Sequence, residues 1–179
     1  MPKYIAFLRA INVGGHTVKM DQLRSLFESM GFAKVETFIA SGNVIFDSPS
    51  KSPQALEKKI EKSLQQALGY AVATFLRSTS ELSDVVAHKA FSETEVNTPG
   101  HTLYIGFMAG KPSDSAENLL LAANSEVEDF HLNGRELYWL LRAKFGDSKF
   151  SGSRLEKTLG QSVTFRNVTT VRKLVAKYS

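Results

Sequence analysis

The feature that most constrains the fold of this chain is an internal repeat. Four residues of the first half recur in the second half at a constant offset of 92: Val35, Glu36, Phe38 and Gly42 correspond to Val127, Glu128, Phe130 and Gly134. Self-similarity at a fixed spacing is the signature of a duplicated structural unit. Four matching letters can arise by chance, but the predicted elements also follow the same order in both halves, and this favours duplication.

Each half predicts the order β-α-β-β-α-β followed by a further helix. The first predicted strand of each half is almost continuously apolar, as expected for a buried central strand. Ser41-Gly42-Asn43 and Asn133-Gly134 mark hairpins, because Gly and Asn tolerate positive φ. The first half predicts strands at 4–11, 35–39, 44–46 and 71–76 and helices at 20–30, 53–68 and 80–87. The second half predicts strands at 102–108, 127–132, 137–141 and 163–165 and helices at 115–123, 153–159 and 170–178.

This order of elements is that of the ferredoxin-like fold. The sequence therefore predicts an α+β protein with two ferredoxin-like halves, each containing an antiparallel sheet. We expect an N-terminal half at residues 1–92 and a C-terminal half at residues 100–179. The boundary is placed within 89–100, where the periodicity lapses and Ser, Thr, Glu, Pro and Gly collect.

The composition is typical of a soluble globular protein, with 42% hydrophobic and 22% charged residues. No stretch approaches the roughly 18 consecutive apolar residues that a membrane span needs. The chain has no cysteine, which excludes disulfides and thiolate chemistry. The absence of a signal-peptide pattern at the N-terminus adds to the expectation of a cytoplasmic protein. The net charge of +4 permits attraction to phosphate-bearing partners.

Two polar loops of the first half are predicted to converge. Right-handed crossovers make the first and second strands of such a half parallel, with the third strand antiparallel between them. The loop at 9–15 and the hairpin tip at 41–43 then lie at the same end of the sheet. Two glycine-bearing polar loops at one sheet end are typical of a small binding site, although both can also be ordinary turns.

The candidate ligand-binding residues come from these loops and from the start of the next helix. Arg9 can clamp a phosphate or carboxylate, or it can pair with an internal acid such as Glu36 or Asp47. Asn12 and Asn43 can orient a ligand or close turns through their own backbone. The glycines would let an anion reach backbone N–H groups. The candidates in this region are Arg9, Asn12, Gly14, Gly15, Lys19, Ser41, Gly42 and Asn43.

Two further segments carry charge in a suggestive pattern. Arg166 and Asn167 end a strand before a helix, which is a possible seat for an anion, yet Arg77 has the same setting in the first half, as duplicated caps would. The loop at 142–154 interleaves basic residues with Phe145 and Phe150. Such a loop can track a nucleic-acid backbone, or its phenylalanines can anchor it to the core. We favour the anchored loop.

Several motifs together resemble one bacterial family, catalogued as domain of unknown function 1697. They are the segment 4–15, which reads Tyr-Ile-Ala-Phe-Leu-Arg-Ala-Ile-Asn-Val-Gly-Gly, then Lys19-Met20, Gly31-Phe32, Ser41-Gly42-Asn43-Val44 and the closing segment 164–174. The chain departs from the family in having Lys89-Ala90-Phe91 where Asn-Pro-Phe is frequent, and Val168 where an aromatic residue is frequent. The resemblance implies a duplicated α+β fold and no particular reaction.

The sequence predicts no cofactor and no metal site. The histidines at 16, 88, 101 and 131 are scattered, without carboxylates at ligand spacing. No nucleophile with a recognisable base is present, so catalytic residues stay unknown. We expect a binding module for a phosphate-bearing small molecule or nucleic acid. The alternatives are an enzyme that acts on a small anionic metabolite through Ser41 or His16, and a protein-interaction module that uses a sheet face or edge.

Overall fold

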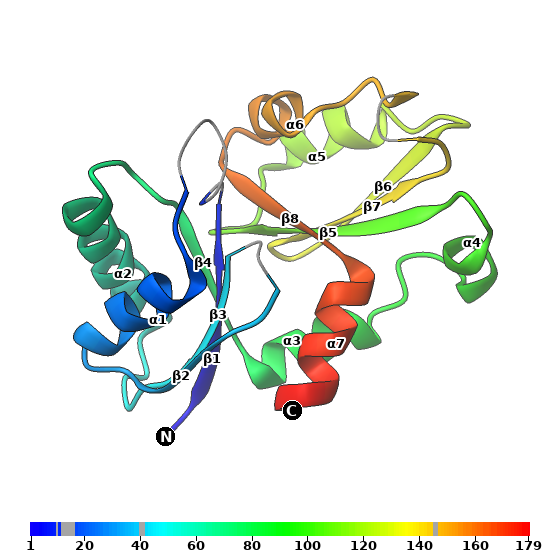
Figure 1. Ribbon diagram of the computed structural model, residues 1–179. Coiled ribbons are helices and arrows are strands. Elements are labelled where there is room, and N and C mark those ends of the chain that lie inside the picture. Colours follow the sequence, from blue (N-terminus) through cyan, green and yellow to red (C-terminus); the bar gives the residue numbers. More distant parts are fainter. Residues whose placement is uncertain (10, 12–16, 40–41, 145–146) are drawn as a thin grey trace. The chain divides into compact units, whose positions relative to one another are not determined.

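The computed structural model describes residues 1–9, 11, 17–39, 42–144 and 147–179. The chain forms two compact units, Met1–Ser83 together with Tyr178–Ser179, and Asp84–Lys177. Each unit contains a four-stranded antiparallel sheet combined with helices (Figure 1). The predicted duplicated α+β, ferredoxin-like arrangement is thereby confirmed. The ranges 1–92 and 100–179 refer to the repeat in the sequence, and they stay a prediction.

The sheet of the first unit has the strand order β2-β3-β1-β4. Its neighbouring strands are all antiparallel, so β1 and β2 run parallel to each other. The strands are β1 (Lys3–Leu8), β2 (Ala33–Thr37), β3 (Asn43–Asp47) and β4 (Thr74–Ser78). The end of β1 and the tip of the β2–β3 hairpin therefore lie at the same end of the sheet.

Two helices of the first unit, α1 (Met20–Ser29) and α2 (Pro53–Leu68), follow from local sequence signals. The Ser52 hydroxyl accepts a hydrogen bond from the Ala55 N–H at 3.3 Å, and Pro53 occupies the first helical position of α2. Gly69, in the left-handed conformation, ends α2. The residues that α2 buries recur every four positions, on one face of the helix: Leu56, Ile60 and Leu64.

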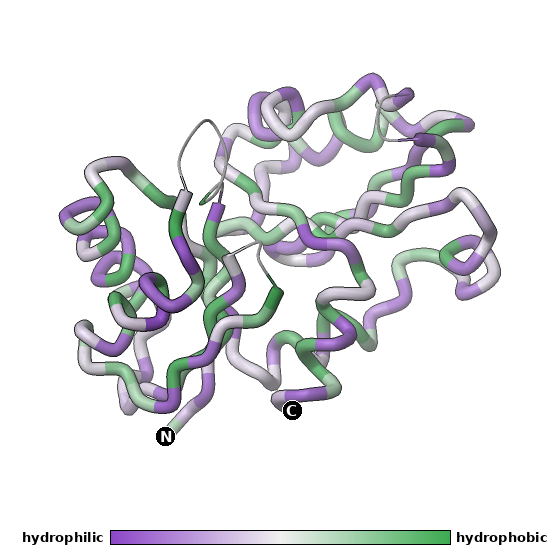
Figure 2. The backbone as a smooth tube through the Cα atoms, in the orientation of Figure 1, coloured by the Kyte–Doolittle hydropathy of each residue, from purple (hydrophilic) through white to green (hydrophobic). Residues whose placement is uncertain are grey.

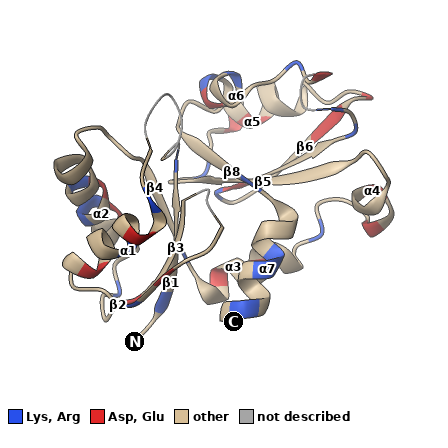
Figure 3. Ribbon diagram, viewed as in Figure 1, with Lys and Arg blue, Asp and Glu red and all other residues tan. Residues whose placement is uncertain are grey.

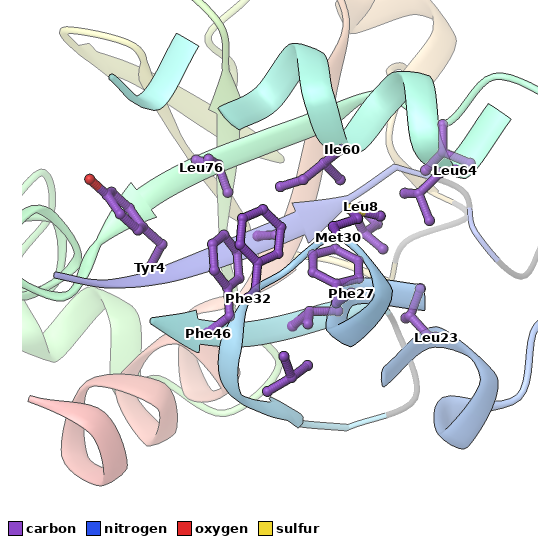
Figure 4. Close-up of a cluster of buried hydrophobic side chains, with 14 of the residues drawn as sticks. Tyr4, Leu8, Leu23, Phe27, Met30, Phe32, Phe46, Ile60, Leu64 and Leu76 are labelled. Carbon is purple, nitrogen blue, oxygen red and sulfur yellow. The ribbon is translucent and has the colours of Figure 1, made fainter. Parts of the chain in front are cut away.

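The core of the first unit lies between these two helices and one face of the sheet (Figure 4). Phe27 of α1 lies against Phe46 of β3, and Phe46 stacks on Phe32 with ring centroids 4.3 Å apart. Ile5 and Phe7 point to the other face of β1 and are buried as well. Burial on both faces explains why the sequence of β1 is continuously apolar and does not alternate.

The second unit repeats this plan, with the strand order β6-β7-β5-β8. Its strands are β5 (Thr102–Met108), β6 (Glu128–Asn133), β7 (Glu136–Leu141) and β8 (Val163–Asn167). Residues of α5 (Asp114–Leu121) and α6 (Gly152–Leu159) join one face of the sheet in a core around Trp139. Figure 2 shows long hydrophobic stretches along the central strands, and Figure 3 shows charged residues on several of the helices.

Several elements differ from the sequence-based expectation, among them β1, which ends at Leu8 and not at residue 11, and β2, which spans Ala33–Thr37 and not 35–39. Strand β4 begins at Thr74, because pairing with β1 starts at the Leu8–Thr74 register. Helix α7 (Val168–Tyr178) begins directly after β8. Helix α4 (Glu93–Asn97), which lies in the predicted linker, was not expected, because five residues are too few to display helical periodicity. Helix α3 (Thr79–Ala87) agrees with the prediction to within one residue at its start.

Candidate functional site

The predicted meeting of the first loop with the first hairpin rests on a direct backbone contact. The Leu8 N–H at the end of β1 donates to the Gly42 carbonyl at 2.9 Å. The next amide, that of Arg9, donates to the Ala73 carbonyl at 2.9 Å. The backbone that opens the first loop is therefore held between the hairpin tip and the residues before β4.

Gly42 is required by this contact. Its φ is 81°, which side chains disfavour, and a Cβ placed there would lie 2.8 Å from Ile11 Cγ2 and 3.2 Å from Leu8 Cβ. Such distances are below van der Waals contact, so the glycine lets the hairpin tip approach the strand end. The candidate role of Gly42 thus includes a close backbone approach, although its partner here is the chain itself.

The other described hairpin residues divide into a structural and a strained position. Asn43 is fully buried, and its Nδ2 donates to the Phe38 carbonyl at 2.8 Å. That bond closes the hairpin, which was the structural alternative for this residue. Ile39 has a φ of 58° and is 49% exposed. A β-branched residue in the left-handed region is strained, and such strain clusters at functional sites. Sequence reasoning missed Ile39, because no residue type signals this conformation there.

The two cations of the candidate set flank the first loop. Arg9 is half-buried, and Lys19 is exposed at the N-cap of α1. The acids first considered as partners of Arg9 lie elsewhere. Asp47 is at the other end of β3, where it accepts a hydrogen bond from Lys3 Nζ at 2.8 Å. Glu36 of β2 pairs with Ile45 of β3, and Ile45 pairs in turn with Ile5 of β1. Arg9 is four residues farther along the chain than Ile5, so Glu36 and Arg9 are separated by about 13 Å along the strand direction, which is too far for an ion pair.

Five residues singled out from the sequence lie outside the described residues. They are Asn12, Gly14, Gly15, His16 and Ser41. Phe145 of the basic loop lies outside the described residues as well.

Arg166 and Asn167 belong to the second unit. Arg166 is 7% exposed, and its Nη1 donates to Thr164 Oγ1 at 2.8 Å and to the Phe165 carbonyl at 2.9 Å. Burial lowers the pKa of this guanidinium to about 10. Asn167 Oδ1 accepts the Thr169 N–H at 2.9 Å and so caps the start of α7. Arg77, the equivalent of Arg166, is also buried and donates to the preceding carbonyl at 2.8 Å. The recurrence agrees with the structural alternative, and a ligand contact of Arg166 and Asn167 stays a prediction.

The basic loop is anchored to the core, as we favoured. Phe150 is 9% exposed and packs edge-on against Phe130, with ring centroids 5.2 Å apart. The Arg154 guanidinium lies over the Phe150 ring at 4.6 Å. Arg142 donates to Asp129 Oδ2 at 2.6 Å and to Glu95 Oε2 at 3.1 Å. These basic side chains hold the loop and its neighbours in place.

Glu128 binds the same loop through hydrogen bonds, and this role was not predicted from the sequence. It is 1% exposed, and its carboxylate accepts Trp139 Nε1–H at 2.9 Å and the Ser148 hydroxyl at 2.6 Å. The signal that could have found it is the alternation along the strand, because Glu128 occupies an inward position whose next inward residue is Phe130. Its partner in the sequence repeat, Glu36, is exposed and gives no such signal.

The described surface also has hollows away from the predicted loops. Grooves of about 550 and 610 Å³ run beside α2, and Lys59 lines both. Lys59 Nζ donates to the Met30 carbonyl at 2.8 Å and lies 5.3 Å from the centre of the Phe32 ring. The lining residues of these two grooves include none of the predicted site residues. Among the residues that the structure describes, no group of three or more acidic or histidine side chains is placed to hold a metal ion.

None of the helices in the described part of the chain combines the length and apolar character needed to cross a membrane. Among curated proteins, none is a significant match to this chain. Among solved structures, conserved bacterial protein SP0830 from Streptococcus pneumoniae is similar, with a TM-score of 0.80 and 21% sequence identity over 99% of this chain and 98% of that chain. This similarity supports the fold. Residues 1–138 match the family model described as protein of unknown function DUF1697, and the chain therefore belongs to that family.

Proposed function

We propose that this protein is a binding module for a phosphate-bearing ligand, which is seated at the loop after β1. The observation that carries the proposal is the Leu8–Gly42 backbone contact of 2.9 Å, because it brings the hairpin tip to the end of β1 beside a loop flanked by two cations. Arg9 and Lys19 would neutralise negative charge. Asn12, Gly14, Gly15 and Ser41 would contribute amide, backbone and hydroxyl donors.

Two described features support this assignment. Helix α1 begins at Met20, and the side chain of its N-cap residue Lys19 makes no capping bond, so an anion would find the positive end of the helix dipole without a cap from Lys19. Ile39 lies half exposed on the hairpin with a strained, positive φ. Such backbone conformations tend to persist where function requires them.

Ligand titration with wild type and Arg9→Ala tests the proposal. The affinities for inorganic phosphate, a nucleoside monophosphate and a short oligonucleotide are measured by titration calorimetry. For any probe that binds, Arg9→Ala should lower the affinity by roughly tenfold or more, as expected for the loss of a charge-assisted contact. Arg24→Ala is the matched control, because Arg24 is an exposed cation of α1 that faces Asp21 at 3.6 Å and Glu28 at 3.7 Å.

The outcomes separate the ligand classes. Affinity that falls steeply with salt indicates nucleic acid, because each phosphate contact releases counterions. Equal affinity of wild type and Arg9→Ala, or no binding of any probe up to millimolar concentration, would reject the proposal.

A further inference from the structure

Two histidines of the second unit meet although they are far apart in the sequence. His88 follows α3, His131 lies on edge strand β6, and their Nε2 atoms are 3.0 Å apart. The ring centroids are 5.2 Å apart, with an interplanar angle of 23°. In each imidazole, Nε2 lies at a fixed distance from the centroid of its own ring. The two centroids are farther apart than the two Nε2 atoms by nearly twice that distance. The imidazoles therefore face each other end to end, with their Nε2 lone pairs on one line.

This geometry favours a shared proton over a shared metal ion. A metal ion draws two imidazole lone pairs to a common point that lies off the line between the nitrogens. Lone pairs that lie along that line fit an N–H···N hydrogen bond. Within the described residues, no third histidine or carboxylate joins the two rings in a ligand group. One Nε2 of the pair must carry a hydrogen and the other must accept it.

The contact lies where the end of α3 meets the sheet of its own unit. The His88 N–H donates to the Asp84 carbonyl at 3.0 Å, so His88, directly after α3, closes the last turn of the helix. One turn earlier, the Val85 carbonyl accepts the Tyr138 hydroxyl of β7 at 2.7 Å. The His88 ring also lies 5.3 Å from the Tyr138 ring. The imidazole pair and the tyrosine thus fasten the same end of the helix.

We propose that the His88–His131 pair is a pH-sensitive latch, which holds the end of α3 on β6 until both imidazoles are protonated. A neutral pair keeps one donor and one acceptor, and a singly charged pair keeps a charge-assisted hydrogen bond. A doubly charged pair has two donors and no acceptor. It also places two like charges 3.0 Å apart, so the contact breaks.

The surroundings set the pH at which the latch opens. Burial and then the charge of His88 lower the pKa of His131 below its ordinary value of 6.5, while Glu117 acts in the opposite direction. Because the folded pKa is the lower one, this stabilisation is complete above pH 6.5 and is lost as the pH falls through the folded pKa. The other charged or titratable side chains around the pair and the small cavity beside it include Lys89, Glu93, Glu117, Tyr138, Arg172 and, acting on Tyr138, Glu136.

Side-chain ¹⁵N NMR of the full chain tests the latch directly. His131 should take up its proton below pH 6.5, and the ¹⁵N signals of both rings should change at that step because the rings share one hydrogen bond. His101, whose Nδ1 lies 2.7 Å from the Glu95 carbonyl oxygen, is the internal control. A protonation of His131 that leaves the ring signals of His88 unchanged would overturn the proposal, and this measurement needs no variant.

Hydrogen exchange then shows whether the titration moves the helix. After correction for intrinsic rates, amides in the last turn of α3 should exchange at least about tenfold faster at pH 5 than at pH 7.5, because two unit charges 3.0 Å apart repel by about that factor even in water. His131→Gln, which keeps a neutral hydrogen-bonding side chain beside His88, should abolish this pH dependence. The same acceleration in His131→Gln as in wild type would refute the latch. His88→Gln provides the reciprocal variant.

Discussion

Replacing Gly42 by alanine should loosen the sheet end on which the proposed site depends. Gly42 has a φ of 81°, and an added Cβ would lie 2.8 Å from Ile11 Cγ2 and 3.2 Å from Leu8 Cβ. Ile11 is only 2% exposed, so its side chain cannot yield into solvent. The hairpin tip must therefore move away from the end of β1, and the Leu8–Gly42 hydrogen bond must lengthen.

Two costs add in this variant. A left-handed backbone conformation costs alanine about 1–2 kcal/mol. An extra carbon forced into a packed contact costs about 1–3 kcal/mol. We expect Gly42→Ala to lower the free energy of unfolding by about 2–5 kcal/mol, a large share of the 5–15 kcal/mol that is typical of a folded protein.

Gly69→Ala separates the two costs. Gly69 has nearly the same φ, 82°, but a Cβ there would meet nothing within 4 Å. The Gly69→Ala variant should lose only the backbone cost of about 1–2 kcal/mol. Urea denaturation followed by circular dichroism measures both losses, and native-state hydrogen exchange should show a faster Leu8 amide only in Gly42→Ala. Equal losses in the two variants would refute the close approach.

Three more variants test other features of the structure. Ile39→Asn should raise the free energy of unfolding by about 1 kcal/mol, because asparagine tolerates positive φ; a urea midpoint that does not rise contradicts the strain. Glu128→Ala should cost about 2–4 kcal/mol in the same assay, because the donors of Trp139 and Ser148 lose their buried acceptor, and a loss below 1 kcal/mol would show that the loop does not depend on this carboxylate. Burial raises the pKa of Tyr138 above its ordinary value of 10.0, so the free energy of unfolding should hold up to about pH 10 and fall as the pH rises toward the folded pKa. Urea denaturation between pH 9 and 11 should show a shallower fall of this free energy in Tyr138→Phe. Identical slopes in the variant and in wild type would count against a buried neutral phenol.

The fold could be predicted because its signals are local. Apolar periodicity gives the elements, Gly42 and Gly134 mark the hairpins, and crossover handedness then leaves one strand order for each half. The same reasoning placed the first loop and the first hairpin at one sheet end. The Leu8–Gly42 hydrogen bond and the register of β1 with β3 agree with that placement.

The features that escaped prediction depend on contacts between distant residues. Whether Glu128 is a solvated or a buried carboxylate is decided by donors 11 and 20 positions away. His88 and His131 are separated by 43 positions, and no local pattern pairs them. Arg166 ends a strand in the way a ligand-binding arginine does, and its hydrogen bonds to Thr164 and the neighbouring carbonyl could not be predicted from that pattern.

The burial of Trp139 gives the protein a built-in optical probe of one half. It is the only tryptophan of the chain, is 1% exposed and lies in the core of the second unit. The fluorescence of Trp139, excited at the red edge of its absorption band, therefore reports on Asp84–Lys177 alone. Far-ultraviolet circular dichroism, in contrast, averages over both halves. If the two signals change at different denaturant concentrations, the duplicated halves melt as separate cooperative blocks.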